Sequence, residues 1–493
     1  MNVIVIGSSL AGLACSIRLA LEGHKVTICE ATAEAGGSFR FVHKDGFHFC
    51  RDAPLLHAPE ELCALFSLAG KRLDDYLRYT EISVRCRYFY PDKTTLSLPA
   101  SRKAFEQEIS QRFELEDSPM TTYLTQRSRL FERVRSPFLE RSLHRWSTYF
   151  SKKTWALLPY IFQMPLLASF HRTNKLQLEH PKLVQLIDDF SHVMGSSPYR
   201  MPGVLPVLPH LEYTAGSFVV KGGKRALLGA LLKLSAELGV EHHFETPVRR
   251  ILLKDRQAAG VSIPHGDLSA DAVVSGVDAA TVYHHMLPRI DRSSSILKQE
   301  RSYATLHFFW GIEGTFEEMA LQNVFFGPHY VDEFKELFEA KQMPKEPTFR
   351  VHITAKNQHS DAPSQQENWV VSVPAPTHTG QDWSSVVESV RSYVLDRLRR
   401  VLGRSVESLI RCEHVHTPAD AEQYGYAYQG SCCGTSHHGI LAAFARHPNF
   451  SKSISRLYFC GSSVHPGAGL PRNLMSAKIV SDLMSADFKK KRL

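Results

Sequence analysis

The sequence predicts a mixed α/β fold that is built on a dinucleotide-binding βαβ unit and interleaved with a second domain. Three observations lead to this prediction: a strand, glycine turn, helix and strand over residues 3–30, a glycine pair at 36–37, and a glycine-rich stretch after an apolar strand at 457–471. The chain of 493 residues is long enough for two or three domains with a large core.

The composition excludes several classes of protein. Hydrophobic residues make up 43% of the chain and charged residues 22%, which is ordinary for a globular protein. The net charge of +8 is too diffuse to indicate nucleic-acid binding, and no nucleic-acid-binding motif is present. The nine cysteines are scattered without a CxxC pair, which favours a reducing compartment. The chain begins with a strand rather than a signal peptide, and no apolar run is long enough for a spanning helix. We therefore expect a cytoplasmic protein.

The amino-terminal stretch "VIVIGSSLAGLACSIRLALEGHKVTICE" has the order of a dinucleotide-binding unit. A β-branched strand ends at Gly7, a helix is predicted from about Leu10 to Glu22, and a second strand ends at Glu30. Gly12 allows the helix to pack on the strand, and the helix amino terminus attracts a pyrophosphate. Glu30 is placed to accept hydrogen bonds from ribose hydroxyls.

Two positions depart from the usual pattern of such a site. The middle glycine of the fingerprint is replaced by Ser9, whose hydroxyl is itself able to bond a phosphate oxygen. The glycine pair Gly36 and Gly37 brings backbone against the dinucleotide, but Ser38 follows where a basic residue is usual, and Arg40 stands two places later.

The middle of the chain predicts alternating helices and strands. Residues 54–80 and 101–200 are predicted to be mainly helical, and residues 212–275 to form strand, helix and strand. Strands are expected over 302–375 with a helical stretch near 331–341, followed by an amphipathic helix over 385–402. Only one dinucleotide fingerprint occurs, so we expect no dedicated nicotinamide domain.

Residues 127–153 combine eight Arg or Lys with two Glu and five aromatic residues. Ser136-Pro137 is typical of a helix start, and apolar residues from Phe138 to Phe150 then recur at helical spacing. Two interpretations stay open: a surface helix packed on the core, or an interfacial helix whose basic residues meet anionic lipid.

Metal and hydrolase sites are disfavoured. The pairs His242-His243, His284-His285 and His437-His438 are poor bidentate ligands because adjacent strand residues point apart. His414 and His416 share a strand face, but no further ligand stands at metal-binding spacing. "GTSHHG" lacks the spacing of a nucleophile elbow. We expect no bound metal.

Over nearly its whole length the chain resembles the bacterial-type phytoene desaturase family of FAD-dependent carotenoid oxidoreductases. Besides the amino-terminal unit, the matching blocks are "GFHF" at 46–49, "EYTAGSFVVKGG" at 212–223, "VVSGVDA" at 273–279, "TPADAEQY" at 417–424 and "LYFCGSSVHPGAGLPRNLMSAKIV" at 457–480. The last block is the most specific. Residues 434–469 look nearest to subgroups that act on modified carotenoids, the hydroxy- or methoxycarotenoid 3,4-desaturases and the terminal oxidases of acyclic carotenoids.

The resemblance implies a Rossmann-type FAD-binding domain of the amine-oxidase/GDI-like superfamily. We expect this domain over 1–80, 212–300 and 410–493, a substrate domain over 81–125 and 301–409, and a helical, membrane-associated region over 126–211. The residues expected to bind FAD are Gly7, Ser8, Ser9, Leu10, Ala11, Gly12, Glu30, Gly36, Gly37, Ser38, Arg40, Val248, Gly461, Gly467, Gly469 and Leu470.

The implied reaction is desaturation of an acyclic carotenoid in an apolar tunnel. A hydride passes to the flavin and a proton is released, while the conjugated chain spreads the positive charge, so that an elaborate acid–base array is unnecessary. Asp52, Asp278 and His465 are candidates for a catalytic base from motif neighbourhood alone.

The expected partners are a membrane-dissolved carotenoid, an anionic membrane surface, and oxygen or a quinone as electron acceptor. Three alternatives remain: a terminal oxidase, a carotenoid isomerase, or a flavin-less prenyl-binding protein like the Rab-escort and GDP-dissociation-inhibitor proteins. The departures at Ser9 and Ser38 leave the last alternative open.

Overall fold

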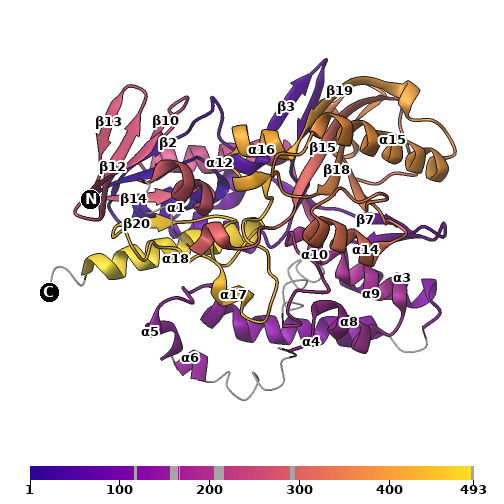
Figure 1. Ribbon diagram of the computed structural model, residues 1–493, viewed down its shortest axis with the longest axis horizontal. Coiled ribbons are helices and arrows are strands. Elements are labelled where there is room, and N and C mark those ends of the chain that lie inside the picture. Colours follow the sequence, from indigo (N-terminus) through magenta and orange to yellow (C-terminus); the bar gives the residue numbers. More distant parts are fainter. Residues whose placement is uncertain are drawn as a thin grey trace.

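The computed structural model describes residues 1–115, 119–150, 152–155, 165, 167–204, 216–288 and 295–489. Figure 1 shows a five-stranded sheet with its helices on the left, a seven-stranded sheet on the right and a group of helices below both. The prediction of a mixed α/β fold is confirmed.

The five-stranded sheet is parallel throughout and collects segments from the whole chain. Its order is β10 (Glu241–His243), β2 (Lys25–Cys29), β1 (Asn2–Ile6), β14 (Ala272–Ser275) and β20 (Leu457–Phe459). Val3 and Val5 of β1 pack on one face, and Ile4 and Ile6 pack on the other. Burial on both faces explains why this strand is a continuous apolar run.

Both faces of this sheet are covered. The helices α1 (Leu10–Leu21), α2 (Glu60–Leu68), α12 (Gly223–Glu237) and α18 (Leu470–Lys489) contribute to the core cluster on one face. On the other face lies an antiparallel sheet of β11 (Arg250–Lys254), β12 (Gln257–Ile263) and β13 (Gly266–Ser269), next to the short helix α13 (Ala279–Thr281). The first strand, helix and strand follow the predicted bounds to within one or two residues.

The seven-stranded sheet is the centre of the second part of the fold. Its order is β19 (Ile410–His416), β15 (Ala304–Glu313), β18 (Gln366–Ala375), β17 (Phe349–Ile353), β16 (Gln322–Phe325), β7 (Val84–Phe89) and β8 (Thr95–Pro99). One face packs on α15 (Trp383–Leu402) through Trp310 and Trp369. Since β19 pairs with β15, we propose that the boundary expected at residue 410 lies after His416.

The segment expected to be helical over 54–80 contains strands as well. β5 (Leu55–Leu56) and β6 (Tyr79–Glu81) flank β9 (Phe218–Val220) in a small antiparallel sheet. β3 (Phe41–Lys44) and β4 (Phe47–Cys50) form a hairpin that precedes β5 in the sequence. Strands of two or three residues are too short to show a period in the sequence.

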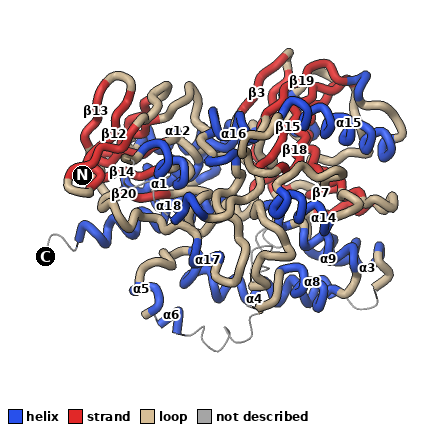
Figure 2. Tube along the Cα trace, viewed as in Figure 1, coloured by secondary structure: helices blue, strands red, loops and turns tan. Residues whose placement is uncertain are grey.

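The lower part of the molecule consists of helices and loops (Figure 2). It contains α3 (Arg102–Arg112), α4 (Pro119–Val134), α5 (Trp146–Tyr149), α6 (Lys152–Trp155), α8 (Phe170–Leu178), α9 (Pro181–Asp188) and α10 (Phe190–Val193). Several of these share a core cluster with β7, β8 and α14 (Tyr330–Lys335). The remaining short helices are α16 (Pro418–Gly425) and α17 (Ala442–Ala445).

The predicted helix from Ser136 to Phe150 is wrong. α4 continues instead through a π-helical turn over Arg135–Leu139, and the chain then bends before α5. In the bend, the hydroxyls of Thr148 and Tyr149 donate to the backbone carbonyls of Ser142 (2.7 Å) and Leu143 (2.6 Å), which replaces helical hydrogen bonds.

Among the described residues, no helix has the length and apolar composition needed to span a bilayer. The longest apolar stretch of the sequence covers residues 155–170. Most of it lies outside the described residues.

Candidate dinucleotide site and the cavity beside it

The first strand, turn and helix present backbone N–H groups at the start of α1. Gly7 takes a left-handed backbone conformation (φ 89°), and a Cβ on Gly12 would collide with the Gly7 carbonyl. The Ser9 hydroxyl accepts a hydrogen bond from the Gly12 N–H (3.3 Å) and thereby caps the helix. Ser9 therefore has a structural role that the sequence pattern did not predict.

The Glu30 carboxylate is already saturated with hydrogen bonds. One oxygen accepts from the N–H and the hydroxyl of Ser8, both at 2.7 Å. The other accepts from the N–H (3.0 Å) and hydroxyl (2.8 Å) of Thr32. A carboxylate offers about four acceptor positions. The Thr32 hydroxyl also lies 2.8 Å from the Glu34 carbonyl and has only one proton, so a ribose hydroxyl can take its place on Glu30. Thr32 is a member of this network that the motif did not reveal.

The glycine pair packs directly against Ser9. The Gly36 N–H donates to the Ser8 carbonyl (3.2 Å), and Gly37 has a left-handed φ of 57°. A Cβ on Gly37 would lie 2.8 Å from the Ser9 Cβ, a distance that side-chain atoms do not tolerate. The serine in the fingerprint is therefore accommodated by the glycine that follows 28 positions later.

The carboxyl-terminal glycines fall into two groups. Gly461 follows β20, and a Cβ there would lie 3.6 Å from the Gly276 carbonyl and 3.8 Å from Ala11, at the edge of the amino-terminal turn. Gly467 instead faces His437 and Arg446, and Gly469 faces Arg472. Both arginines are buried. All three glycines have φ between 112° and 115°, where other residues are strained.

Arg446 ties two loops together beside these glycines. Its guanidinium donates to the carbonyls of Thr435 (3.2 Å), Val464 (3.0 Å) and Cys433, and burial lowers its pKa to about 10. Gly467 therefore borders this arginine and is not among the residues that line the cavity.

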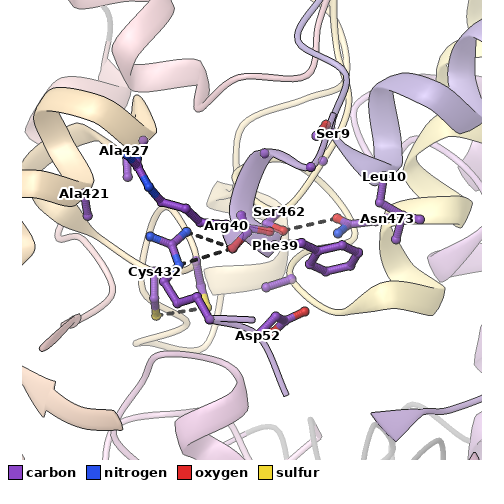
Figure 3. A pocket seen from close by; sticks show the side chains of 18 of the residues that line it. Ser9, Leu10, Phe39, Arg40, Asp52, Ala421, Ala427, Cys432, Ser462 and Asn473 are labelled. Carbon is purple, nitrogen blue, oxygen red and sulfur yellow. Dashed lines mark hydrogen bonds between the residues drawn. The ribbon is translucent and has the colours of Figure 1, made fainter. Parts of the chain in front are cut away.

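One cavity of about 840 Å³ joins these elements to the seven-stranded sheet. Figure 3 shows Ser9 and Leu10 of the first turn, Phe39 and Arg40, and Asn473 of α18 around it. Of the residues expected to bind the cofactor, those that line the cavity are Gly7, Ser9, Leu10, Ala11, Glu30, Gly36, Gly37, Ser38, Arg40, Val248, Gly461, Gly469 and Leu470. Ser8, Gly12 and Gly467 do not line it. Ser8 and Gly12 instead hydrogen-bond to the lining residues Glu30 and Ser9.

Comparison with known proteins identifies the group to which this site belongs. Residues 10–485 match the model of the flavin containing amine oxidoreductases. The chain belongs to this family. A 1-hydroxycarotenoid 3,4-desaturase of Flavobacterium sp. (strain P99-3) is 35% identical over 486 residues, which cover 98% of this chain and 99% of that protein. A 4,4'-diapolycopene oxygenase of Methylomonas sp. is 30% identical over 507 residues, covering 99% and 98% of the two chains.

Solved structures agree on the fold. Wild-type putrescine oxidase bound to putrescine superposes with a TM-score of 0.64 at 15% sequence identity and covers 99% of both chains. The expected relationship to the bacterial phytoene desaturase group is confirmed, and the chain is an FAD-dependent oxidoreductase. The cradle fits this cofactor, because left-handed glycines and a helix amino terminus leave the backbone open to a pyrophosphate.

The three candidate bases differ in their surroundings. Asp52 lines the cavity (Figure 3). Asp278 also lines it, but it caps α13 by accepting from the Ala280 N–H (2.9 Å) and forms a buried ion pair with Arg301. His465 is buried away from the cavity, and burial lowers its pKa to about 3. Asp278 is thus engaged in structural contacts, and His465 does not line the cavity.

Three cavity residues were not predicted from the motifs. Lys224 is buried at the start of α12, where its Nζ donates to the Leu55 carbonyl (2.8 Å) and burial lowers its pKa. Cys432 and Cys433 place their Sγ atoms 3.1 Å apart on the cavity wall. Their adjacency in the sequence, and the lysine directly after the pair Gly222-Gly223, were the available signals.

Among the described residues, no group of three or more His, Cys, Asp or Glu is arranged to hold a metal ion. His242 and His243 lie on a strand as assumed. His284 and His285 instead lie in a π-helical turn, where their rings are in contact (Nδ1 to Nε2, 3.1 Å).

Proposed function

We propose that this enzyme desaturates an acyclic carotenoid that carries a functionalised end group. The observation that carries the proposal is the 35% identity, over nearly the full length of both chains, to a protein named 1-hydroxycarotenoid 3,4-desaturase. The continuous cavity supports it, because a long substrate needs to reach from the dinucleotide cradle to the second sheet.

We further propose that FAD is held by the backbone of the first turn and α1 start (residues 7–12), Glu30, the pair Gly36 and Gly37, and Gly461. FAD, when bound, supplies the acceptor for a hydride from the substrate. The protein side of the reaction is to hold the polyene against the cradle and to exclude water. Oxygen or a quinone is the proposed electron acceptor, because the sequence contains a single dinucleotide fingerprint.

Asp52 is the proposed proton acceptor, since it lines the cavity and, among the described residues, is not held in a direct ion pair as Asp278 is by Arg301, although Arg51 and Lys224 act on it electrostatically. The polyene delocalises the developing positive charge, so the proton is lost from an acidic carbon and the demand on a base is small.

The test is expression in a bacterial host engineered to make phytoene, neurosporene, lycopene and their 1-hydroxy derivatives. The expected product has lost two mass units and absorbs at longer wavelength. Oxygen gained at a terminal methyl would instead establish a terminal oxidase, which the 30% identity to a diapolycopene oxygenase makes the second candidate. An unchanged mass with altered retention would establish an isomerase, and no change in any pigment would refute the carotenoid assignment.

We also infer peripheral binding to a membrane, through exposed apolar side chains of two segments that lie together. His144 Nε2 donates to the Phe444 carbonyl (2.9 Å), which joins the α5–α6 region to α17 (Figure 1). The exposed large apolar side chains of these two segments are Trp146, Phe150, Trp155, Ile440, Leu441 and Phe444, of which Trp146 is 79% and Phe150 73% exposed. Large exposed aromatic side chains in one area indicate an interaction surface.

The basic residues of this region are not all available to lipid. Arg145 forms an ion pair with Asp487 (2.8 Å) and stacks over the Phe450 ring. Its positive charge is therefore already paired within the protein. Arg141 is exposed, whereas the side chains of Lys152 and Lys153 lie outside the described residues. We therefore expect aromatic insertion to dominate over charge.

The double substitution Trp146→Ala with Phe150→Ala is expected to lower vesicle binding by about tenfold or more, because each buried aromatic side chain contributes about 1.5–3 kcal/mol. Flotation with vesicles containing anionic lipid measures the effect, and Leu68→Ala, an exposed leucine on α2, is the matched control. Equal flotation of the double variant and the control would show that this surface is not the membrane contact.

A further inference from the structure

Part of the cavity wall is formed by polar side chains from the seven-stranded sheet. Strand pairing places His307 opposite Ser372, Ser372 opposite Arg350, and Gln322 opposite His352. All of these residues line the cavity. The opposite face of the same sheet carries the apolar core around Trp310 and Trp369. A hydrocarbon substrate alone gives no reason for a polar cavity wall, because buried polar groups are costly without partners.

His192 on α10 presents an unused acceptor. Its ring is 4% exposed and lines the cavity. The Tyr303 hydroxyl donates to the His192 carbonyl (2.6 Å) and lies 3.3 Å from His192 Nδ1. Because the hydroxyl proton is used on the carbonyl, Nδ1 carries the imidazole proton and donates to the tyrosine oxygen. The Nε2 atom is then an acceptor, and it is buried without a partner among the described residues.

His352 on β17 also has an unpartnered ring nitrogen, although no hydrogen bond fixes its tautomer. It is 6% exposed and lines the cavity, and its Nδ1 is buried without a partner in the part of the chain that the structure describes. Arg350 lies close to both rings, and burial together with this cation lowers the pKa of His352 to about 3 and that of His192 well below its ordinary value. Both imidazoles are therefore neutral at physiological pH. Arg350 itself is neutralised by an ion pair with Asp189.

We propose that His192 and His352 bind the hydroxyl group at the end of the carotenoid and so determine which end groups the enzyme accepts. This inference rests on the proposed function. The hydroxyl of such an end group donates its single proton to His192 Nε2, and its oxygen accepts from His352 in the Nδ1–H tautomer and from the Gln322 amide opposite it. An end group without a hydroxyl leaves the buried nitrogens unpaired, and a site of this kind rejects the analogue strongly.

The unaltered holoenzyme provides the first test. Flavin reduction is followed without oxygen, using three substrates with one carbon skeleton: the 1-hydroxy carotenoid, its 1-methoxy ether and the unsubstituted hydrocarbon. We expect kcat/KM to fall by about 10- to 100-fold for the ether and the hydrocarbon, since neither has a proton to donate. Equal values for all three would overturn this inference but leave the desaturase assignment intact, whereas reduction by none of them would refute the proposed function itself.

Variants of His352 test its part in the effect. His352→Leu is expected to bring the hydroxy-to-hydrocarbon ratio close to one, mainly by slowing the hydroxylated substrate, while His352→Asn keeps a polar N–H donor and much of the ratio. His265→Leu, in an exposed turn between β12 and β13, is the matched control. FAD content and thermal unfolding show whether each variant is folded. If a folded His352→Leu enzyme keeps the ratio of the unaltered protein, the assignment of His352 is wrong.

Discussion

Replacing Asp278 by Ala is expected to lower the free energy of unfolding by about 3–5 kcal/mol. The Asp278 and Arg301 side chains are only 7% and 2% exposed, so the substitution leaves a buried guanidinium without its counter-ion. It also removes the cap of α13, where the carboxylate accepts from the Ala280 N–H. Urea unfolding of the holoenzyme, followed by circular dichroism, measures the change.

The matched control is Asp332→Ala, which breaks an ion pair with Lys335 whose two side chains are each 59% exposed. Solvent screens such a pair, so we expect a loss of stability much smaller than that of Asp278→Ala. Combining Asp278→Asn with Arg301→Met should cost less than Asp278→Ala alone, because no uncompensated charge stays buried. Similar small losses for Asp278→Ala and Asp332→Ala would show that the buried pair contributes little.

Gly37→Ala is expected to weaken FAD binding by about tenfold or more. The new Cβ collides with the Ser9 Cβ at the edge of the cradle, and overpacking of this kind costs about 1–3 kcal/mol. Titration of the apoprotein with FAD, followed by quenching of flavin fluorescence, measures the affinity.

Two further variants separate the collision from backbone strain. Gly239→Ala has the same left-handed strain (φ 78°) but open space around the new Cβ, so it should reduce stability without changing FAD affinity. Ser9→Gly combined with Gly37→Ala removes the colliding atom and should restore most of the affinity. A double variant as weak as Gly37→Ala alone would contradict the proposed dependence of Gly37 on Ser9.

The local patterns of the sequence were sufficient for the elements that form the cradle. A β-branched strand, a glycine turn and an apolar helix predicted β1, α1 and β2, because hydrophobic period and turn residues act over short distances. The same reasoning failed over 136–150, where Arg145 is held by Asp487 and hydroxyl side chains satisfy the bend. Such contacts join residues that are far apart in the chain or lie within a turn. The spacing of apolar residues along a predicted helix therefore gives no indication of them.

What the sequence by itself determined was therefore the class of fold, the glycine motifs of the dinucleotide site and the family. Only the tertiary structure decided that β19 joins the second sheet, that Ser9 requires Gly37, that Asp278 is neutralised by Arg301, and that His192 and His352 meet one cavity from α10 and β17. The physical reason is the same in each case. Strand register, ion pairing and the burial of a polar atom depend on which distant segments pack together, and that packing is a property of the whole chain.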